Sequence, residues 1–168
     1  INKLNFQNSP LKSNEIFCCS KFNSGIFFGT GSGLYYFSEN KLKIVDKPEL
    51  NKQKISAIYA SDDLLFVSVW GKGIYCFDKN FNMKLTLDKT NGLTNLYISS
   101  IILNKDELWF GTIGNGVGVF NFKNKNILYY TSKDGLISSD ISVLYFDKYL
   151  DSIWIGFWGP GIVTTVEE

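Results

Sequence analysis

The sequence contains no histidine and no arginine, so lysine supplies all 17 basic residues. Without histidine, the chain has no imidazole for acid–base catalysis or for a histidine-based metal site. Without arginine it has no guanidinium to clamp a phosphate, and its net charge of only +1 is unlike that of a nucleic-acid-binding domain. We therefore expect no nucleic-acid partner, no bound metal and no cofactor.

Cysteines and long hydrophobic runs are also scarce. The three cysteines, Cys18, Cys19 and Cys76, are odd in number and two are adjacent, so they predict no disulfide framework and indicate buried structural thiols. The apolar runs are far shorter than the ~20 residues of a membrane-spanning helix. The chain begins at Ile1 rather than Met, which indicates a mature or excised piece of a longer product.

Aromatic residues, in contrast, are abundant, at 16% of a chain that is 45% hydrophobic and 20% charged. A chain of 168 residues with this composition can bury a core. We therefore expect residues 1–168 to form a single folded domain.

The chain repeats itself four times. A Leu is followed five residues later by an Ile, and the pair recurs every 39 to 43 residues, at Leu11 and Ile16, Leu50 and Ile55, Leu93 and Ile98, and Leu136 and Ile141. A second anchor follows each pair: an apolar run, a small residue and a glycine-rich turn, at residues 25–37, 64–77, 107–120 and 152–165. These anchors divide the chain into repeats of about residues 11–49, 50–92, 93–135 and 136–168.

Each repeat has the pattern of four short strands. In the third repeat the apolar and aromatic segments are residues 97–103, 107–113, 116–122 and 127–132, separated by turn-forming residues. Four antiparallel strands in about 40 residues are typical of a β-propeller blade. A β-sandwich is the alternative, but it would not explain the regular repeat.

The glycines of the repeat have two predicted roles. Gly29, Gly111 and Gly156 lie in the second strand, where a missing side chain lets another sheet approach closely. Glycine pairs at 71/73, 114/116 and 159/161 allow the positive φ angles of a tight turn before the third strand.

The two ends of the sequence complement each other. The fourth repeat stops after three strands, near Val166, whereas residues 3–6 precede the first repeat with the pattern of an outer strand. Pairing of the chain ends would close a four-bladed ring without exposed strand edges. The other interpretation is an arc of a larger propeller.

The third and fourth repeats resemble a known family. The run from Glu107 to Phe120 is similar to the core of the two-component regulator propeller repeat, and residues 135–147 and 92–101 are similar to its opening segment. The first two repeats are looser, with Phe27 and Phe66 in place of tryptophan. The resemblance implies a non-enzymatic, extracytoplasmic (periplasmic or cell-surface) sensor of a signalling protein, some members of which bind oligosaccharides. A cytoplasmic location stays open.

The turns between second and third strands, together with the links between repeats, mark one face of a propeller. On it, Trp70 and Trp158 end their strands and could stack on a sugar ring or an apolar ligand, while Lys72, Asn115 and Asp134 could donate or accept hydrogen bonds. We predict these five as ligand-binding residues. The alternative for both tryptophans is packing between blades, which we expect for Trp109 and Trp154.

Two further functions remain open. The aromatic face or an unpaired blade edge could bind a protein partner or a second copy of the chain. A propeller hydrolase or lyase is a weaker alternative, because the acidic pair Asp62 and Asp63 lies in a turn at the opposite face and is expected to be solvated. We predict no catalytic residues.

Overall fold

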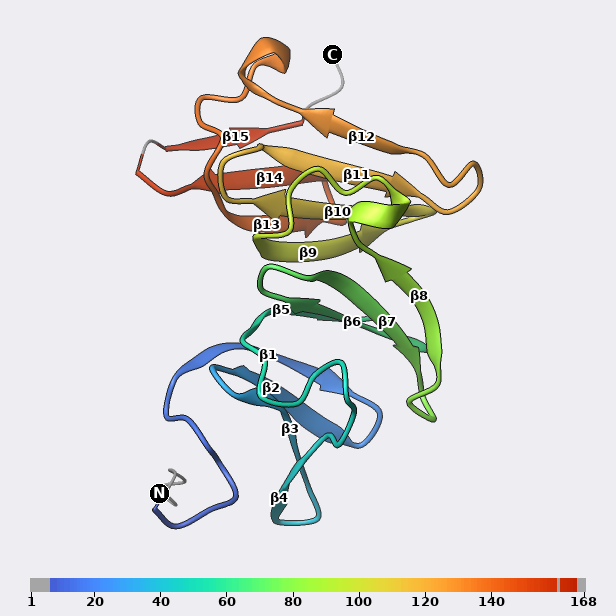
Figure 1. Cartoon of the computed structure of the whole chain (residues 1–168). Helices are drawn as coiled ribbons and strands as arrows, with labels where there is room; N and C mark the ends of the chain where they lie inside the picture. Colours follow the sequence, from blue (N-terminus) through green and yellow to red (C-terminus); the bar gives the residue numbers. More distant parts are fainter. Residues whose placement is uncertain (1–6, 160, 166–168) are drawn as a thin grey trace. The chain divides into compact units, whose positions relative to one another are not determined.

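The computed structural model describes residues 7–159 and 161–165, and nearly all of their regular structure is β-strand (Figure 1). The all-β prediction is therefore confirmed. The strands are β1 (Ile16–Phe22), β2 (Gly25–Thr30), β3 (Gly33–Ser38), β4 (Lys41–Ile44), β5 (Ile55–Ala60), β6 (Leu64–Val69), β7 (Gly73–Asp78), β8 (Met83–Leu87), β9 (Ile98–Asn104), β10 (Glu107–Thr112), β11 (Val117–Asn121), β12 (Ile127–Tyr130), β13 (Ile141–Asp147), β14 (Ser152–Phe157) and β15 (Ile162–Thr164). Two short 3-10 turns, η1 (Lys89–Asn91) and η2 (Ser132–Asp134), precede β9 and β13.

The strands form four small sheets, each with its strands in chain order: β1–β4, β5–β8, β9–β12 and β13–β15. We call these sheets blades 1 to 4. The blades coincide with the four predicted repeats. Blade 4 has three strands among the described residues; the proposed outer strand at residues 3–6 and residue 160, between the predicted turn glycines 159 and 161, lie outside them.

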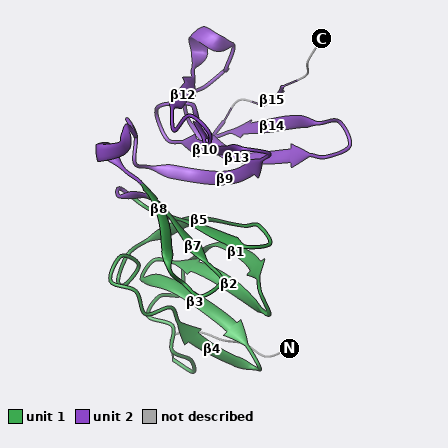
Figure 2. Ribbon diagram, turned by 90° about the vertical axis from the view of Figure 1, so that its right-hand side faces the viewer, with its two compact units in different colours: residues 1–70, 74–86 green, residues 71–73, 87–168 purple. Residues whose placement is uncertain are grey.

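The chain divides into two compact units (Figure 2). Unit 1 comprises residues 1–70 and 74–86 and holds blade 1 and most of blade 2. Unit 2 comprises residues 71–73 and 87–168 and holds blades 3 and 4. The expectation of a single domain stays a prediction.

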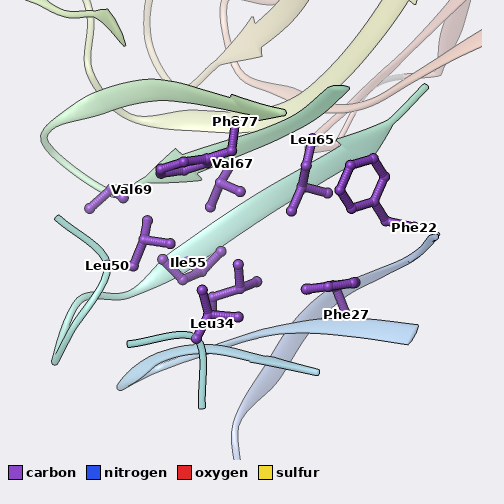
Figure 3. Packing of buried hydrophobic residues seen from close by; sticks show 10 residues of the cluster. Phe22, Phe27, Leu34, Leu50, Ile55, Leu65, Val67, Val69 and Phe77 are labelled. Atoms are coloured by element: carbon purple, nitrogen blue, oxygen red, sulfur yellow. The ribbon is translucent and has the colours of Figure 1, made fainter. Parts of the chain in front are cut away.

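In unit 1, blades 1 and 2 share a hydrophobic core (Figure 3). Phe22 and Phe27 of blade 1 meet edge to face, with ring centroids 5.9 Å apart. They pack in one cluster with Leu65 and Phe77 of blade 2, and the ring of Phe81 lies 5.6 Å from that of Phe27. The space between these two blades is thus filled by aromatic side chains.

The small residue of the second strand brings consecutive blades together, as predicted. A Cβ placed on Gly111 would lie 2.5 Å from Cγ2 of Ile141 in blade 4, and one on Gly29 would lie 2.8 Å from Cγ2 of Ile55 in blade 2. The hydroxyl of Ser99 donates to the carbonyl of Ile141 at 2.5 Å. Any side chain at these glycines would push the next blade away.

The glycine pairs before the third strands adopt positive φ, as predicted: Gly71, Gly73, Gly114, Gly116, Gly159 and Gly161 all do so. In blade 3, the hydroxyl of Thr112 closes the turn by donating to the carbonyl of Gly116 at 2.8 Å. A Cβ on Gly116 would lie only 2.1 Å from the carbonyl oxygen of Tyr130. Both the backbone conformation and the neighbouring strand therefore require glycine here.

Candidate functional site

Trp158 is the most exposed of the predicted ligand-binding aromatics. It follows β14 directly, and 66% of its surface is accessible to solvent. Its backbone N–H donates to the carbonyl of Asp140 at 3.0 Å, which fixes the start of the turn while leaving the indole available.

The side chains of Asn115 and Asp134 both form hydrogen bonds within the protein. The amide of Asn115 donates to the hydroxyl of Thr94 at 2.7 Å. The carboxylate of Asp134 accepts from the backbone N–H of Thr131 at 2.8 Å and from its hydroxyl at 3.1 Å, completing the capping box of η2. Contacts within the protein thus account for both side chains: Asn115 ties its turn to the link that holds Thr94, and Asp134 completes the cap of η2.

Trp70 and Lys72 fall on different sides of the division between the two units. Trp70 belongs to unit 1, whereas Lys72, Asn115, Asp134 and Trp158 belong to unit 2. Trp70 is half-buried, and the ammonium of Lys54 lies 4.5 Å from its ring centroid and 4.4 Å from that of Phe17. This cation–π contact occupies part of the surface that a ligand would need.

Unit 2 contains a cleft of about 770 Å³ between blades 3 and 4. Of the five predicted ligand-binding residues, Asp134 lines it. The volume is within the range of typical small-molecule sites.

The blade 3 wall of the cleft carries an aromatic platform and a held carboxylate. The rings of Trp109 and Tyr130 stack with centroids 5.7 Å apart and planes 7° from parallel. Beside them, the carboxylate of Glu107 accepts from the indole N–H of Trp109 at 3.1 Å and from the amide of Asn121 at 3.3 Å. Trp109 therefore lies between blades, as expected for packing, but it also lines an open space.

The other wall and the rim are different in character. Ile153, Ile155 and Val163 of blade 4 give an aliphatic wall. At the rim, Lys105 pairs with Asp151 at 3.0 Å, and Lys123 pairs with Asp106 at 2.5 Å. The lysines thus neutralise rim carboxylates, while the carboxylate of Glu107 is held by neutral donors.

The repeat itself explains why this cleft is open. Phe77 belongs to the same buried cluster as Phe27 in unit 1, and by repeat position Phe77 corresponds to Thr165 and Phe27 to Trp109. Thr165 is a smaller side chain, and its hydroxyl accepts from the backbone N–H of Ile153 at 2.9 Å. A threonine therefore stands at the repeat position where blade 2 has a buried phenylalanine ring.

Sequence reasoning missed Glu107 and Asn121. The signal that could have identified them is their register: Glu107 of β10 lies directly opposite Asn121 of β11, so both side chains point to the same face as Trp109. The first repeat lacks this pair, because the position of Glu107 is taken there by Gly25, the first residue of β2.

The three thiols differ in environment. Burial raises the pKa of the Cys18 and Cys76 thiols to about 12, whereas Cys19 is exposed.

Within the described residues, no three acidic, cysteine or histidine side chains converge in a way that could hold a metal ion. Among those same residues, no helix is long and apolar enough to span a membrane.

Comparison with solved structures places these features in a known fold. The extracellular domain of the hybrid two-component system BT3049 from B. thetaiotaomicron superposes with a TM-score of 0.79 at 21% identity, over 92% of this chain and 22% of that one. The extracellular domain of the one-component system BT4673 from the same organism gives 0.77 at 16% identity, over 94% and 21%. This chain has a β-propeller fold.

The fold class expected from the repeats, four-stranded propeller blades, is thus confirmed, and so is the resemblance to sensor propellers of two-component systems. No family model matches the chain. Among curated proteins, histidine kinase P4 of Formosa agariphila is 26% identical over 149 residues, which cover 80% of this chain. The propeller spans only 11% of that kinase and about a fifth of the two sensor domains.

Proposed function

We propose that this propeller is part of the extracytoplasmic sensing region of a two-component signalling protein, and that it binds a small polar ligand such as an oligosaccharide without catalysing a reaction. The likeness to extracellular domains of such systems supports the location and the signalling role. The relatives are much longer, so the output of the signal belongs to parts beyond these repeats.

The cleft of unit 2 is the observation that carries the proposal. A sugar presents an apolar C–H face and a rim of hydroxyls, and the cleft offers a matching pair of surfaces. The Trp109–Tyr130 stack provides flat aromatic area, and the Glu107 carboxylate is oriented by two donors and can accept from ligand hydroxyls. Asp134, predicted from the sequence, contributes a second acceptor at the same cleft.

The turns before the third strands remain the second location for the ligand, as the sequence predicts: Trp158, Lys72 and Asn115 in unit 2, and Trp70 in unit 1. One experiment separates the two. A panel of neutral and acidic oligosaccharides is titrated while tryptophan fluorescence is recorded, and each ligand that binds is tested by calorimetry on Glu107→Gln, Trp158→Ala and Trp70→Ala.

Loss of a charge-assisted hydrogen bond in the cleft should weaken binding about 10-fold or more in Glu107→Gln, since such bonds contribute about 1.5–3 kcal/mol. Trp158→Ala and Trp70→Ala should then bind normally. Normal binding by Glu107→Gln with weakened binding by a tryptophan variant would instead indicate that the ligand binds at the turns. Binding unchanged in all three variants would rule out both locations.

A cleft-filling variant gives an independent test. Thr165→Phe restores the residue type that Phe77 provides in unit 1, so it should narrow the cleft and abolish binding without impairing folding. Ser138→Phe is a suitable control, because it adds the same ring to the link before β13, at a residue that does not line the cleft. Normal binding by Thr165→Phe would contradict a ligand in this cleft.

A further inference from the structure

The cleft of unit 2 carries an excess of negative charge. Among the described residues, four carboxylates and two ammonium groups line it: Asp106, Glu107, Asp134 and Asp151, and Lys105 and Lys123. Both ammonium groups pair with carboxylates of the rim, at 3.0 and 2.5 Å. Within the described part of the chain, Glu107 and Asp134 form no ion pair with a lysine. Two negative charges of the cleft are therefore left without a cation.

The carboxylate of Glu107 receives one neutral donor on each oxygen. The indole N–H of Trp109 donates to Oε2 at 3.1 Å, and the amide of Asn121 donates to Oε1 at 3.3 Å. Each carboxylate oxygen has two lone pairs, so both can accept a further hydrogen bond. The two donors orient the carboxylate without cancelling its charge, and a positively charged donor from a ligand would form a stronger bond than a hydroxyl.

The aromatic stack beside Glu107 also favours a cation. An ammonium group near the face of a tryptophan or tyrosine ring is attracted by the negative potential of that face. The chain makes this contact itself in unit 1, where the ammonium of Lys54 lies 4.5 Å from the ring centroid of Trp70. Among the cation–π contacts of the described residues, none involves Trp109 or Tyr130. The cleft thus combines an aromatic stack and an oriented carboxylate, neither of which has a lysine against it.

We propose that the ligand of this cleft is an amino sugar with a free ammonium group, alone or within an oligosaccharide. The inference rests on the proposed function, because it names the class of saccharide that the cleft would bind. The C–H face of the sugar ring would lie on the stack of Trp109 and Tyr130, and the ammonium would donate to Glu107. Asp134 lines the same cleft and would attract the ammonium of a neighbouring sugar unit.

Two matched disaccharides test the role of the ligand charge. Chitobiose with free amines and its N-acetylated counterpart have the same rings and linkage, but only the first carries ammonium groups at mildly acidic pH. By calorimetry at low salt, chitobiose should bind about 10-fold or more tightly than the N-acetylated form, because a hydrogen bond to a charged group contributes more than one between neutral groups. The preference should shrink in about 1 M salt, where charges are screened within about 3 Å.

Three variants test the role of the protein charge. Glu107→Gln should weaken binding of chitobiose more than binding of the N-acetylated form, whereas loss of a purely structural role would weaken both equally. Lys123→Gln releases the carboxylate of Asp106 and should tighten binding of chitobiose, by up to about 5-fold. Asp88→Asn is the control, because it removes a carboxylate of unit 2 that does not line the cleft, and asparagine also caps a helical turn. It should leave the affinity for both disaccharides unchanged.

The outcomes separate this proposal from the saccharide site itself. If the N-acetylated form binds as tightly as chitobiose and Thr165→Phe abolishes that binding, the amino-sugar assignment is wrong and the saccharide site stands. If neither disaccharide binds, the assignment is also wrong, and the panel of neutral and acidic oligosaccharides decides the proposed function on its own. Spermidine, which has amines but no sugar ring, is the third probe: binding as tight as that of chitobiose would overturn recognition of a sugar.

Discussion

Substitution of Gly111 by alanine isolates the contact between blades 3 and 4. The added methyl would lie 2.5 Å from Cγ2 of Ile141 and 2.9 Å from its Cβ, well inside normal contact distance. The φ of Gly111 is not among the positive angles, so the backbone itself tolerates alanine and the cost is steric. Overpacking of this kind costs about 1–3 kcal/mol, and the lower chain entropy of alanine in the unfolded state offsets about 0.4–1 kcal/mol. We expect Gly111→Ala to lower the free energy of unfolding by about 1–2 kcal/mol.

The clash also predicts coupling. Ile141→Ala alone should cost about 2–5 kcal/mol, because Ile141 is fully buried and its removal leaves a cavity. It also removes the Cγ2 atom that the new methyl would strike, although the Cβ at 2.9 Å remains. The double variant should therefore be more stable than the sum of the two losses by about 1 kcal/mol or more, within the range seen for contacting residues.

Urea denaturation followed by tryptophan fluorescence measures all three variants. Gly111→Ala combined with Ile55→Ala is the control, because Ile55 holds the same repeat position in unit 1 and contacts Gly29 instead. That pair should be additive to within about 0.5 kcal/mol. Additive losses for Gly111→Ala with Ile141→Ala would refute the role of this glycine as the notch between blades.

Three other predictions follow from single residues. A thiol reagent should modify exposed Cys19 in the folded protein and leave buried Cys76 intact until urea unfolds the chain; equal rates would contradict the burial. Burial raises the pKa of the Cys76 thiol from 9.0 to about 12. The contribution of this shift to stability is therefore complete below pH 9.0 and is lost as the pH rises toward 12. Above pH 9.0, the urea midpoint of Cys76→Ala should fall less steeply with pH than that of the wild type. The backbone N–H of Asn82 lowers the pKa of the Asp78 carboxyl from 3.8, so the wild type should lose thermal stability on acidification below that pH more than Asp78→Asn does, and parallel curves would exclude this contribution.

The fold was predictable because its determinants are local and repeated. Gly116 needs positive φ and a free approach to Tyr130, and its counterparts Gly73 and Gly161 also adopt positive φ. A pattern that recurs four times identifies such positions without a structure. The bounds shifted where a side chain ended a strand: β12 stops at Tyr130, two residues before the predicted end, because Thr131 caps η2.

The cleft could not be predicted in the same way, because it arises where the repeats differ. A repeat pattern averages over Phe77 and Thr165, yet the exchange of ring for hydroxyl leaves the space beside Trp109 open. The oriented carboxylate depends on Glu107 and Asn121 being opposite each other, a register that only the paired strands establish.

The same reasoning separates structural from functional positions in this chain. Residues that agree among the four repeats, such as the anchor Ile and the notch glycine, build blades and their contacts. At Thr165, which breaks the pattern, a hydrogen bond with Ile153 satisfies the hydroxyl but does not replace the volume of the ring that Phe77 provides in unit 1. An unfilled volume with an aromatic wall costs stability in a free protein, and a ligand that fills it recovers that loss. The departures from the repeat, rather than the repeat itself, are therefore where we expect a ligand to bind.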